Sequence, residues 1–277
     1  MSNFFDELTV LFTTHNRPDL LRQALRTMRA YADPKCRVII LANRCEPHIL
    51  AEVFQIAKET GVEVCKCESK AAAESIKNIV PTLKTEYFSF CHDDIGFVPG
   101  NKMFWDNLLL PLSCKTVAAT GCTSNASDGF QHYQWTHGPD FVKVHNIHIP
   151  ITVWKKDVYE TLGGHDLSIP HSNDIDLCIR AHLAGLDLVV AKNSYVNHVG
   201  GASMDMMYGI GSKYLSVAWI KLMSEKTNNE IIRKHGVKVW ADYSARSYEW
   251  EQVEIMHGPT YATRLKALER QPEAFEI

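Results

Sequence analysis

Two adjacent carboxylates, Asp93 and Asp94, directly follow a short run of apolar and aromatic residues that begins at Tyr87. Such a run is typical of a buried strand, and in a parallel α/β sheet ligands bind at the carboxyl ends of the strands. Neighbouring carboxylates repel each other unless a cation lies beside them. The pair therefore predicts a site for a hard divalent cation, which would take oxygen ligands and also bind a phosphate-bearing substrate.

Alternating strand and helix signals precede this pair. Strands are predicted at 8–12, 37–42 and 62–64, and helices begin at Pro18, at His48 and within the Ala-rich segment 70–83. Strand and helix in alternation over about ninety residues predict right-handed crossovers and a mostly parallel sheet. The turn after the first strand has no GxGxxG sequence, which disfavours a dinucleotide cofactor.

A different pattern follows residue 94. Helices are predicted at 102–112, 156–162, 174–184 and 206–224, and strands at 117–120, within 141–154, at 188–191 and at 196–198. Residues 121–138 are polar and read as a long surface excursion. We therefore expect one α/β domain at 1–204, with a nucleotide-binding half at 1–100 and an acceptor-binding half at 101–204. A helical C-terminal extension would occupy 205–277.

Composition and segment patterns argue against several classes of protein. A net charge of −3 disfavours a broad nucleic-acid surface. No apolar run is long enough to span a bilayer, so at most peripheral membrane contact, through 206–224, is expected. The N-terminal residues do not have the pattern of a secretory signal. The eight cysteines do not follow zinc-site spacing, and we expect free thiols in a reducing cytoplasm.

Five sequence blocks occur in an order that resembles one family. They are Thr13–Pro18, His92–Asp94, Leu162–Asp166, Asn173–Leu177 with Arg180 and Gly185, and His198–Ser203. This arrangement, which covers residues 8–204, is similar to the inverting, nucleotide-sugar-dependent glycosyltransferases of the A-type (GT-A) fold, of the family-two kind. The resemblance implies a single Rossmann-like α/β domain that moves a hexosyl group from a nucleotide-diphosphate sugar to an acceptor hydroxyl.

The resemblance also implies a metal centre and a catalytic base. Asp94 takes the metal-binding place of a DXD-like acidic cluster, and His198 would be a further ligand to Mn²⁺ or Mg²⁺. Asp93 would lie near the donor ribose or the metal, and His92 near the sugar or base. Asp174 takes the place of the general base that removes the proton of the acceptor hydroxyl. Asp176 is expected to orient its loop or to pair with Arg180.

Contacts to the donor follow from the same resemblance. Thr13, His15, Asn16 and Arg17 take the places that contact the nucleotide base. Asn43 stands where the family usually has an aspartate that reads uracil, and Lys77 would approach the diphosphate. Purely structural roles are the alternatives for several of these residues. Asn16 would simply cap the following helix, Lys77 would be a solvated helix lysine, and Asp174 and Asp176 would be first-turn helix acids.

Two other functions remain open at this level. A nucleotidyltransferase that makes nucleotide sugars would have a similar sheet and acidic residues. It would usually have a Gly-rich basic loop after the first strand, but Thr13–Pro18 contains no glycine. A non-catalytic protein that binds a nucleotide sugar or a glycan would account for the unusual residues His92, Ala42 and Asn173. The acceptor is not identified by any motif, so a glycan, a lipid-linked sugar or another hydroxyl compound would fit.

Overall fold

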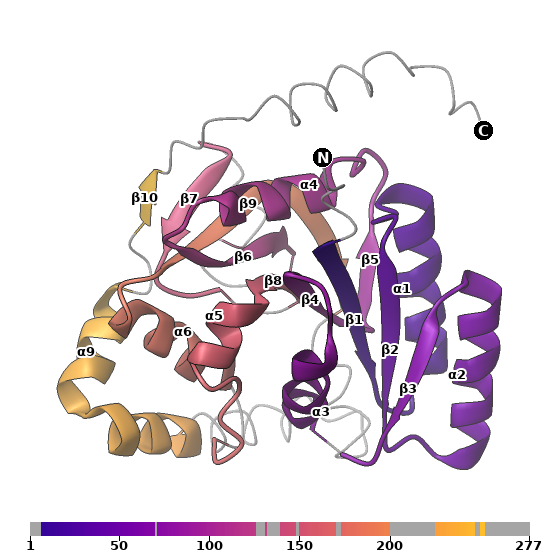
Figure 1. The fold of residues 1–277 in the computed structure, drawn as a ribbon, viewed down its shortest axis with the longest axis horizontal. Coiled ribbons are helices and arrows are strands. Elements are labelled where there is room, and N and C mark those ends of the chain that lie inside the picture. Colours follow the sequence, from indigo (N-terminus) through magenta and orange to yellow (C-terminus); the bar gives the residue numbers. More distant parts are fainter. Residues whose placement is uncertain are drawn as a thin grey trace.

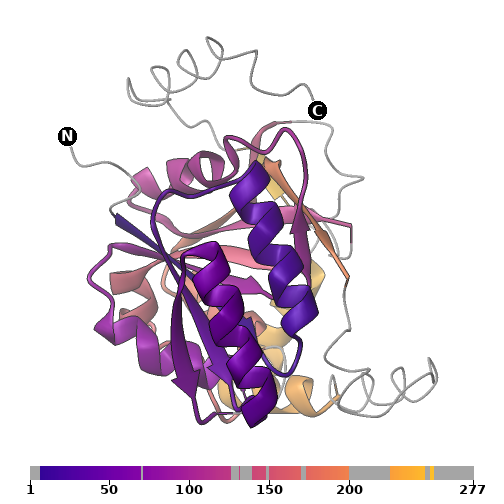
Figure 2. The same cartoon turned by 90° about the vertical axis from the view of Figure 1, so that its right-hand side faces the viewer.

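The computed structural model describes residues 7–69, 71–125, 131, 139–147, 150–169, 173–199, 225–246 and 250–252. The predicted α/β architecture is confirmed: a mixed, largely parallel central sheet lies between two layers of helices (Figures 1 and 2). The predicted helix at 206–224 and most of the predicted excursion at 121–138 lie outside the described residues. The excursion begins later than expected, because strand β6 continues to Ser124.

The first half of the sheet is parallel. Strand β1 pairs with β2 on one side and with β4 on the other, and β2 pairs with β3. All seven residues of β1 are buried, as expected for a strand in a sheet that is covered on both faces. These strands span Leu8–Thr14 (β1), Arg37–Asn43 (β2), Glu63–Cys67 (β3) and Tyr87–His92 (β4).

The second half of the sheet is mixed. Strand β8 runs antiparallel between β4 and β6, and β6 runs parallel to β9. The two short strands predicted at 188–191 and 196–198 are one continuous strand, β9, and β5 was not predicted. The strands are β5 (Ile95–Phe97), β6 (Val117–Ser124), β7 (Phe141–Val144), β8 (Ile151–Lys155), β9 (Asp187–His198) and β10 (Trp250–Gln252).

Helices α1, α2 and α4 cover one face of the sheet, and Figure 2 shows α1 and α2 side by side in front of it. Helix α1 begins with Pro18 at its first turn, where a missing N–H costs nothing, and it buries Leu21, Ala24, Leu25 and Met28 at helical spacing. The three helices span Pro18–Tyr31 (α1), Pro47–Thr60 (α2) and Phe104–Leu109 (α4).

Helices α3, α5 and α6 cover the other face, together with the C-terminal helices. The C-terminal part contributes Ile231 and Tyr243 to this second core, so it packs on the domain rather than standing apart from it. These helices are α3 (Ala72–Ile79), α5 (Lys156–Thr161), α6 (Asn173–Leu183), a helix at 225–235, and α9 (Val237–Arg246).

Candidate functional site

The candidate site forms where β1 and β4 end side by side. In the parallel register Thr13 lies opposite His92, so the residues after both strands emerge at the same edge of the sheet. His198 reaches this edge by a long-range pairing. Strand β5 pairs antiparallel with the end of β9, with Ile95 opposite His198, and the backbone N–H of Val199 donates to the carbonyl of Asp94 at 2.9 Å.

Three side chains converge at this edge. Oδ1 of Asp94 lies 3.2 Å from Nε2 of His198 and 3.7 Å from Nδ1 of His92. One potential ligand atom from each residue lies within 4.8 Å of the others. Ligands at about 2.1–2.2 Å from one ion would be about 3–4.4 Å apart. Asp94 Oδ1 is buried and makes no well-directed hydrogen bond within the described residues. This arrangement fits a divalent cation.

The electrostatics of two of these groups suit metal binding at neutral pH. Burial lowers the pKa of His92 to about 4, so its imidazole is neutral and has a lone pair to offer. Burial alone would raise the pKa of Asp94, but the close contact with His198 and the charge of Arg17 lower it to about 2. One carboxylate with two imidazoles suits Mn²⁺, which accepts nitrogen ligands more readily than Mg²⁺ does.

Asp93 has a different partner, Arg17. Nη2 of Arg17 contacts Oδ1 of Asp93, and its Nη1 lies 3.6 Å from Oδ2 of Asp94. Asp93 is fully buried, and burial raises its pKa to about 6 although the charge of Arg17 opposes this shift. The guanidinium is thus closest to Asp93 and lies at the edge of ion-pair range of Asp94, whose Oδ1 faces the two histidines. The base contact expected of Arg17 stays a prediction.

The other residues of the first block lie between β1 and β2. His15 Nδ1 is 2.7 Å from the carbonyl oxygen of Asn43. Thr13 is buried, and its hydroxyl donates to the carbonyl of Cys91 at 3.4 Å. The capping alternative for Asn16 is wrong: Asn16 Oδ1 accepts from the backbone N–H of Glu46 at 2.9 Å, and the N-cap of α1 is Arg17.

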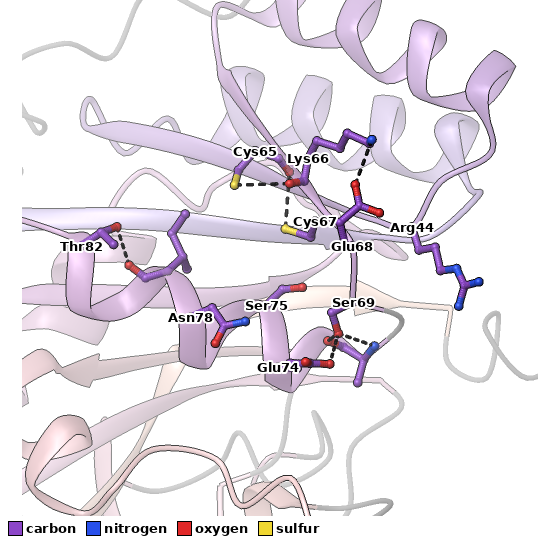
Figure 3. A pocket seen from close by; sticks show the side chains of 12 residues that line it. Arg44, Cys65, Lys66, Cys67, Glu68, Ser69, Glu74, Ser75, Asn78 and Thr82 are labelled. Atoms are coloured by element: carbon purple, nitrogen blue, oxygen red, sulfur yellow. Dashed lines mark hydrogen bonds and ion pairs between the residues drawn. The ribbon is translucent and has the colours of Figure 1, made fainter.

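A pocket of about 660 Å³ opens beside these residues, between the ends of β2 and β3 and helix α3 (Figure 3). Ser75 of α3 lines the pocket and donates its hydroxyl proton to Oδ1 of Asn43, which joins the pocket to the predicted base contacts. Lys77 does not line it. Its Nζ donates to the carbonyl of His165 at 2.9 Å, so Lys77 is not a purely solvated lysine. The pocket is lined by Arg44, Cys65, Lys66, Cys67, Glu68, Ser69, Ala71, Glu74, Ser75, Asn78, Ile79 and Thr82.

Asp174 is the second residue of α6 and is partly buried. Burial lowers the pKa values of His92 and His165, and the negative charge of Asp174 opposes this lowering at both residues. The predicted pair of Asp176 and Arg180 is confirmed, with Nη2 of Arg180 at 2.6 Å from Oδ2 of Asp176. Asp176 has two further partners, Lys234 and His235, which no motif in the sequence indicated.

Searches with protein-family models and among curated proteins found no match for this chain. Solved structures do match its fold. The mannosyltransferase PcManGT from Pyrobaculum calidifontis, solved with GDP-Man and Mn²⁺, superposes with a TM-score of 0.58 at 12% identity, over 95% of this chain and 79% of that one. GalNAc-T7, solved with UDP, GalNAc and Mn²⁺, gives 0.57 at 10% identity, over 69% of this chain and 43% of that one.

Within the described residues no helix is both long and apolar enough to cross a bilayer.

A third match is a structure of residues 1–349 of S. aureus TarS, with a TM-score of 0.55 at 10% identity, over 87% of this chain and 71% of that one. Likeness at such low identity shows the fold alone. The chain shares the α/β fold of the GT-A glycosyltransferases, with a candidate metal triad at the carboxyl end of its parallel strands.

Proposed function

We propose that this protein is an inverting, metal-dependent glycosyltransferase, which moves a sugar from a nucleotide-diphosphate sugar to an acceptor hydroxyl. The observation that carries the proposal is the convergence of His92, Asp94 and His198 within a fold shared with solved glycosyltransferases. In this proposal the triad holds Mn²⁺ or Mg²⁺. When bound, the ion would neutralise the charge that develops on the leaving diphosphate.

The donor would lie along the edge formed by β1, β2 and β4. Its base would contact His15, Asn16 and Asn43 beside the pocket of Figure 3. Thr13 would support this contact indirectly, because its hydroxyl donates to the carbonyl of Cys91 and so holds the ends of β1 and β4 together. Asp93, held by Arg17, would face the ribose. PcManGT was solved with GDP-Man, and GalNAc-T7 with UDP and GalNAc, so guanosine and uridine diphosphate sugars are the first donors to test.

The transfer itself needs one base. Asp174 would take the proton of the acceptor hydroxyl while the acceptor oxygen bonds to the anomeric carbon, opposite the leaving group. The bond from the anomeric carbon to the diphosphate oxygen breaks in the same step, and the nucleoside diphosphate leaves with that electron pair. Lys77 would support this departure as a positive charge near the diphosphate. Displacement from the opposite face inverts the anomeric configuration.

The test begins with a thermal-shift screen of nucleotide sugars in the presence of Mn²⁺, since a ligand that binds only the folded state raises the apparent stability. Release of nucleoside diphosphate and transfer to a panel of glycan and lipid-linked acceptors are then measured with Mn²⁺ and with a chelator. We expect chelation and Asp94→Asn each to lower turnover by about 100-fold or more. Asp19→Asn, which changes an exposed acid of α1, is the matched control.

The outcomes separate the competing functions. Turnover that is insensitive to chelation and to Asp94→Asn would remove the metal from the mechanism. Donor binding in calorimetry without any product over hours would instead identify a non-catalytic nucleotide-sugar-binding protein. Pyrophosphate release from a nucleoside triphosphate and a sugar phosphate would identify a nucleotidyltransferase. Loss of transfer in Asp174→Asn, with Mn²⁺ and donor affinities unchanged, would support Asp174 as the base.

A further inference from the structure

A buried carboxylate, Asp176, lies in the first turn of α6, and the helix at 225–235 supplies two of its partners. The side chain of Asp176 has no exposed surface. Its Oδ1 is 2.8 Å from Nζ of Lys234 and 2.8 Å from Nε2 of His235, both in the helix at 225–235. Its Oδ2 accepts from Nε of Arg180 at 2.8 Å. Partners from two helices therefore hold both oxygen atoms of one carboxylate.

The same cations also hold the loop that leads to α6. Arg180 donates to the carbonyl oxygens of Leu162 and of Gly164, the latter at 2.7 Å. Lys234 reaches Oδ2 of Asp166 at 2.6 Å. We call the set of Asp166, Asp176, Arg180, Lys234 and His235 the C-terminal clamp. It ties three separate segments together: the loop at 162–169, the first turns of α6 and the helix at 225–235.

Because the Asp176 carboxylate is buried, its contacts fix the position of the first turn of α6. A carboxylate without solvent contact requires cationic partners, and removal of one partner leaves an uncompensated charge in the interior. Burial alone would raise the pKa of Asp176, yet the hydrogen bonds from Lys234 and His235 and the charge of Arg180 lower it overall. The clamp is thus an ionised, satisfied network, which fixes the start of α6 against its neighbours.

Asp174 and Asp176 share this first turn. Residues two apart on a helix point about 200° away from each other around its axis. Anchoring Asp176 on one side therefore also sets the direction of the Asp174 side chain on the other side of the helix. A shift of about 1 Å in a reacting group costs on the order of 100-fold in rate.

We propose that the helix at 225–235 is a positioning element for the catalytic base: Lys234 and His235 hold Asp176, and through it they orient Asp174 toward the acceptor hydroxyl. The inference rests on the proposed function of Asp174. It assigns to the C-terminal extension a part in the chemical step, while donor and metal are bound by the N-terminal half and by His198.

The test uses the full chain and Lys234→Met, Lys234→Arg and, as a matched control on the same helix, Arg233→Met. Arg233 pairs only with Glu230 among the described residues and is 69% exposed. We expect Lys234→Met to lower kcat by about 10- to 100-fold, with the donor KM and the Mn²⁺ affinity within about twofold of wild type. Lys234→Arg, which can still donate to both acids, should keep most of the wild-type kcat, and Arg233→Met should leave kcat unchanged.

Hydrogen exchange of residues 162–169 and 173–183 gives a readout that needs no turnover. Exchange there should rise in Lys234→Met and not in Arg233→Met. Unchanged exchange, or raised exchange with unchanged kcat, would overturn the positioning role. If wild type itself transfers no sugar, the proposed function fails, whereas the exchange result still reports the clamp. If Lys234→Met does not fold, Asp166→Ala removes a partly exposed acceptor of the same lysine, and unchanged kcat and exchange in that variant would overturn the inference.

Discussion

The buried imidazole of His165 should make the free energy of unfolding depend on pH. His165 is 6% exposed, and its Nδ1 lies 2.7 Å from Oη of Tyr159. The same tyrosine hydroxyl accepts a hydrogen bond from the backbone N–H of His165 at 3.2 Å. Because a hydroxyl has one proton, it donates to Nδ1 only while the imidazole is neutral. Burial lowers the pKa of His165 to about 4.

The sign and the size of the effect follow from proton linkage. An unfolded histidine has a pKa of about 6.5. Between about pH 4 and pH 6.5 the unfolded state binds more protons than the folded state, so stability increases with pH in this window. The contribution is fully present above about pH 6.5 and is lost as the pH falls toward 4. From about pH 7.5 to about pH 5, this one group should remove about 2 kcal/mol.

The assay is urea unfolding of wild type and His165→Asn at both pH values. The asparagine does not titrate, so the variant should lose about 2 kcal/mol less than wild type on acidification, although it is less stable at neutral pH. Other titrating groups contribute to both proteins and cancel in the comparison. His48→Asn, at a position where the side chain is 73% exposed, should follow wild type. Equal losses in wild type and His165→Asn would refute the reasoning.

Two further perturbations test the site and the loop that leads to α6. Arg17→Met leaves Asp93 buried without its cation and should lower the free energy of unfolding by about 3 kcal/mol in urea at neutral pH; a loss below about 1 kcal/mol, typical of an exposed pair, would contradict the burial argument. Gly164→Ala places a Cβ 3.0 Å from the ring of Tyr159 at φ +65°, whereas Gly61→Ala, at φ +66°, meets no atom within 4 Å. The first should therefore cost about 1 kcal/mol more than the second in thermal unfolding, and equal costs would show that the ring moves aside.

Local patterns were sufficient to predict the strands and helices that carry the two acids of the site and the residues around them, although not β5. Strand β1 and helix α1 follow from an apolar run and from Leu21, Ala24, Leu25 and Met28 at helical spacing, because both signals depend only on neighbours in the chain. The place of Asp93 and Asp94 at the end of β4 follows for the same reason. The pairing of Asp176 with Arg180 was predictable because residues four apart share one face of a helix.

What the sequence by itself determined was thus the order of elements and the acids at their ends. Only the tertiary structure brings those acids together with their distant partners. The family resemblance implied that His198 joins Asp94, and the two meet because β5, too short to predict, pairs with the end of β9. Lys234 and His235 reach Asp176 because a C-terminal helix packs on α6. No hydrophobic periodicity in the sequence predicts either contact, because each depends on how separate segments of the chain pack on the same sheet.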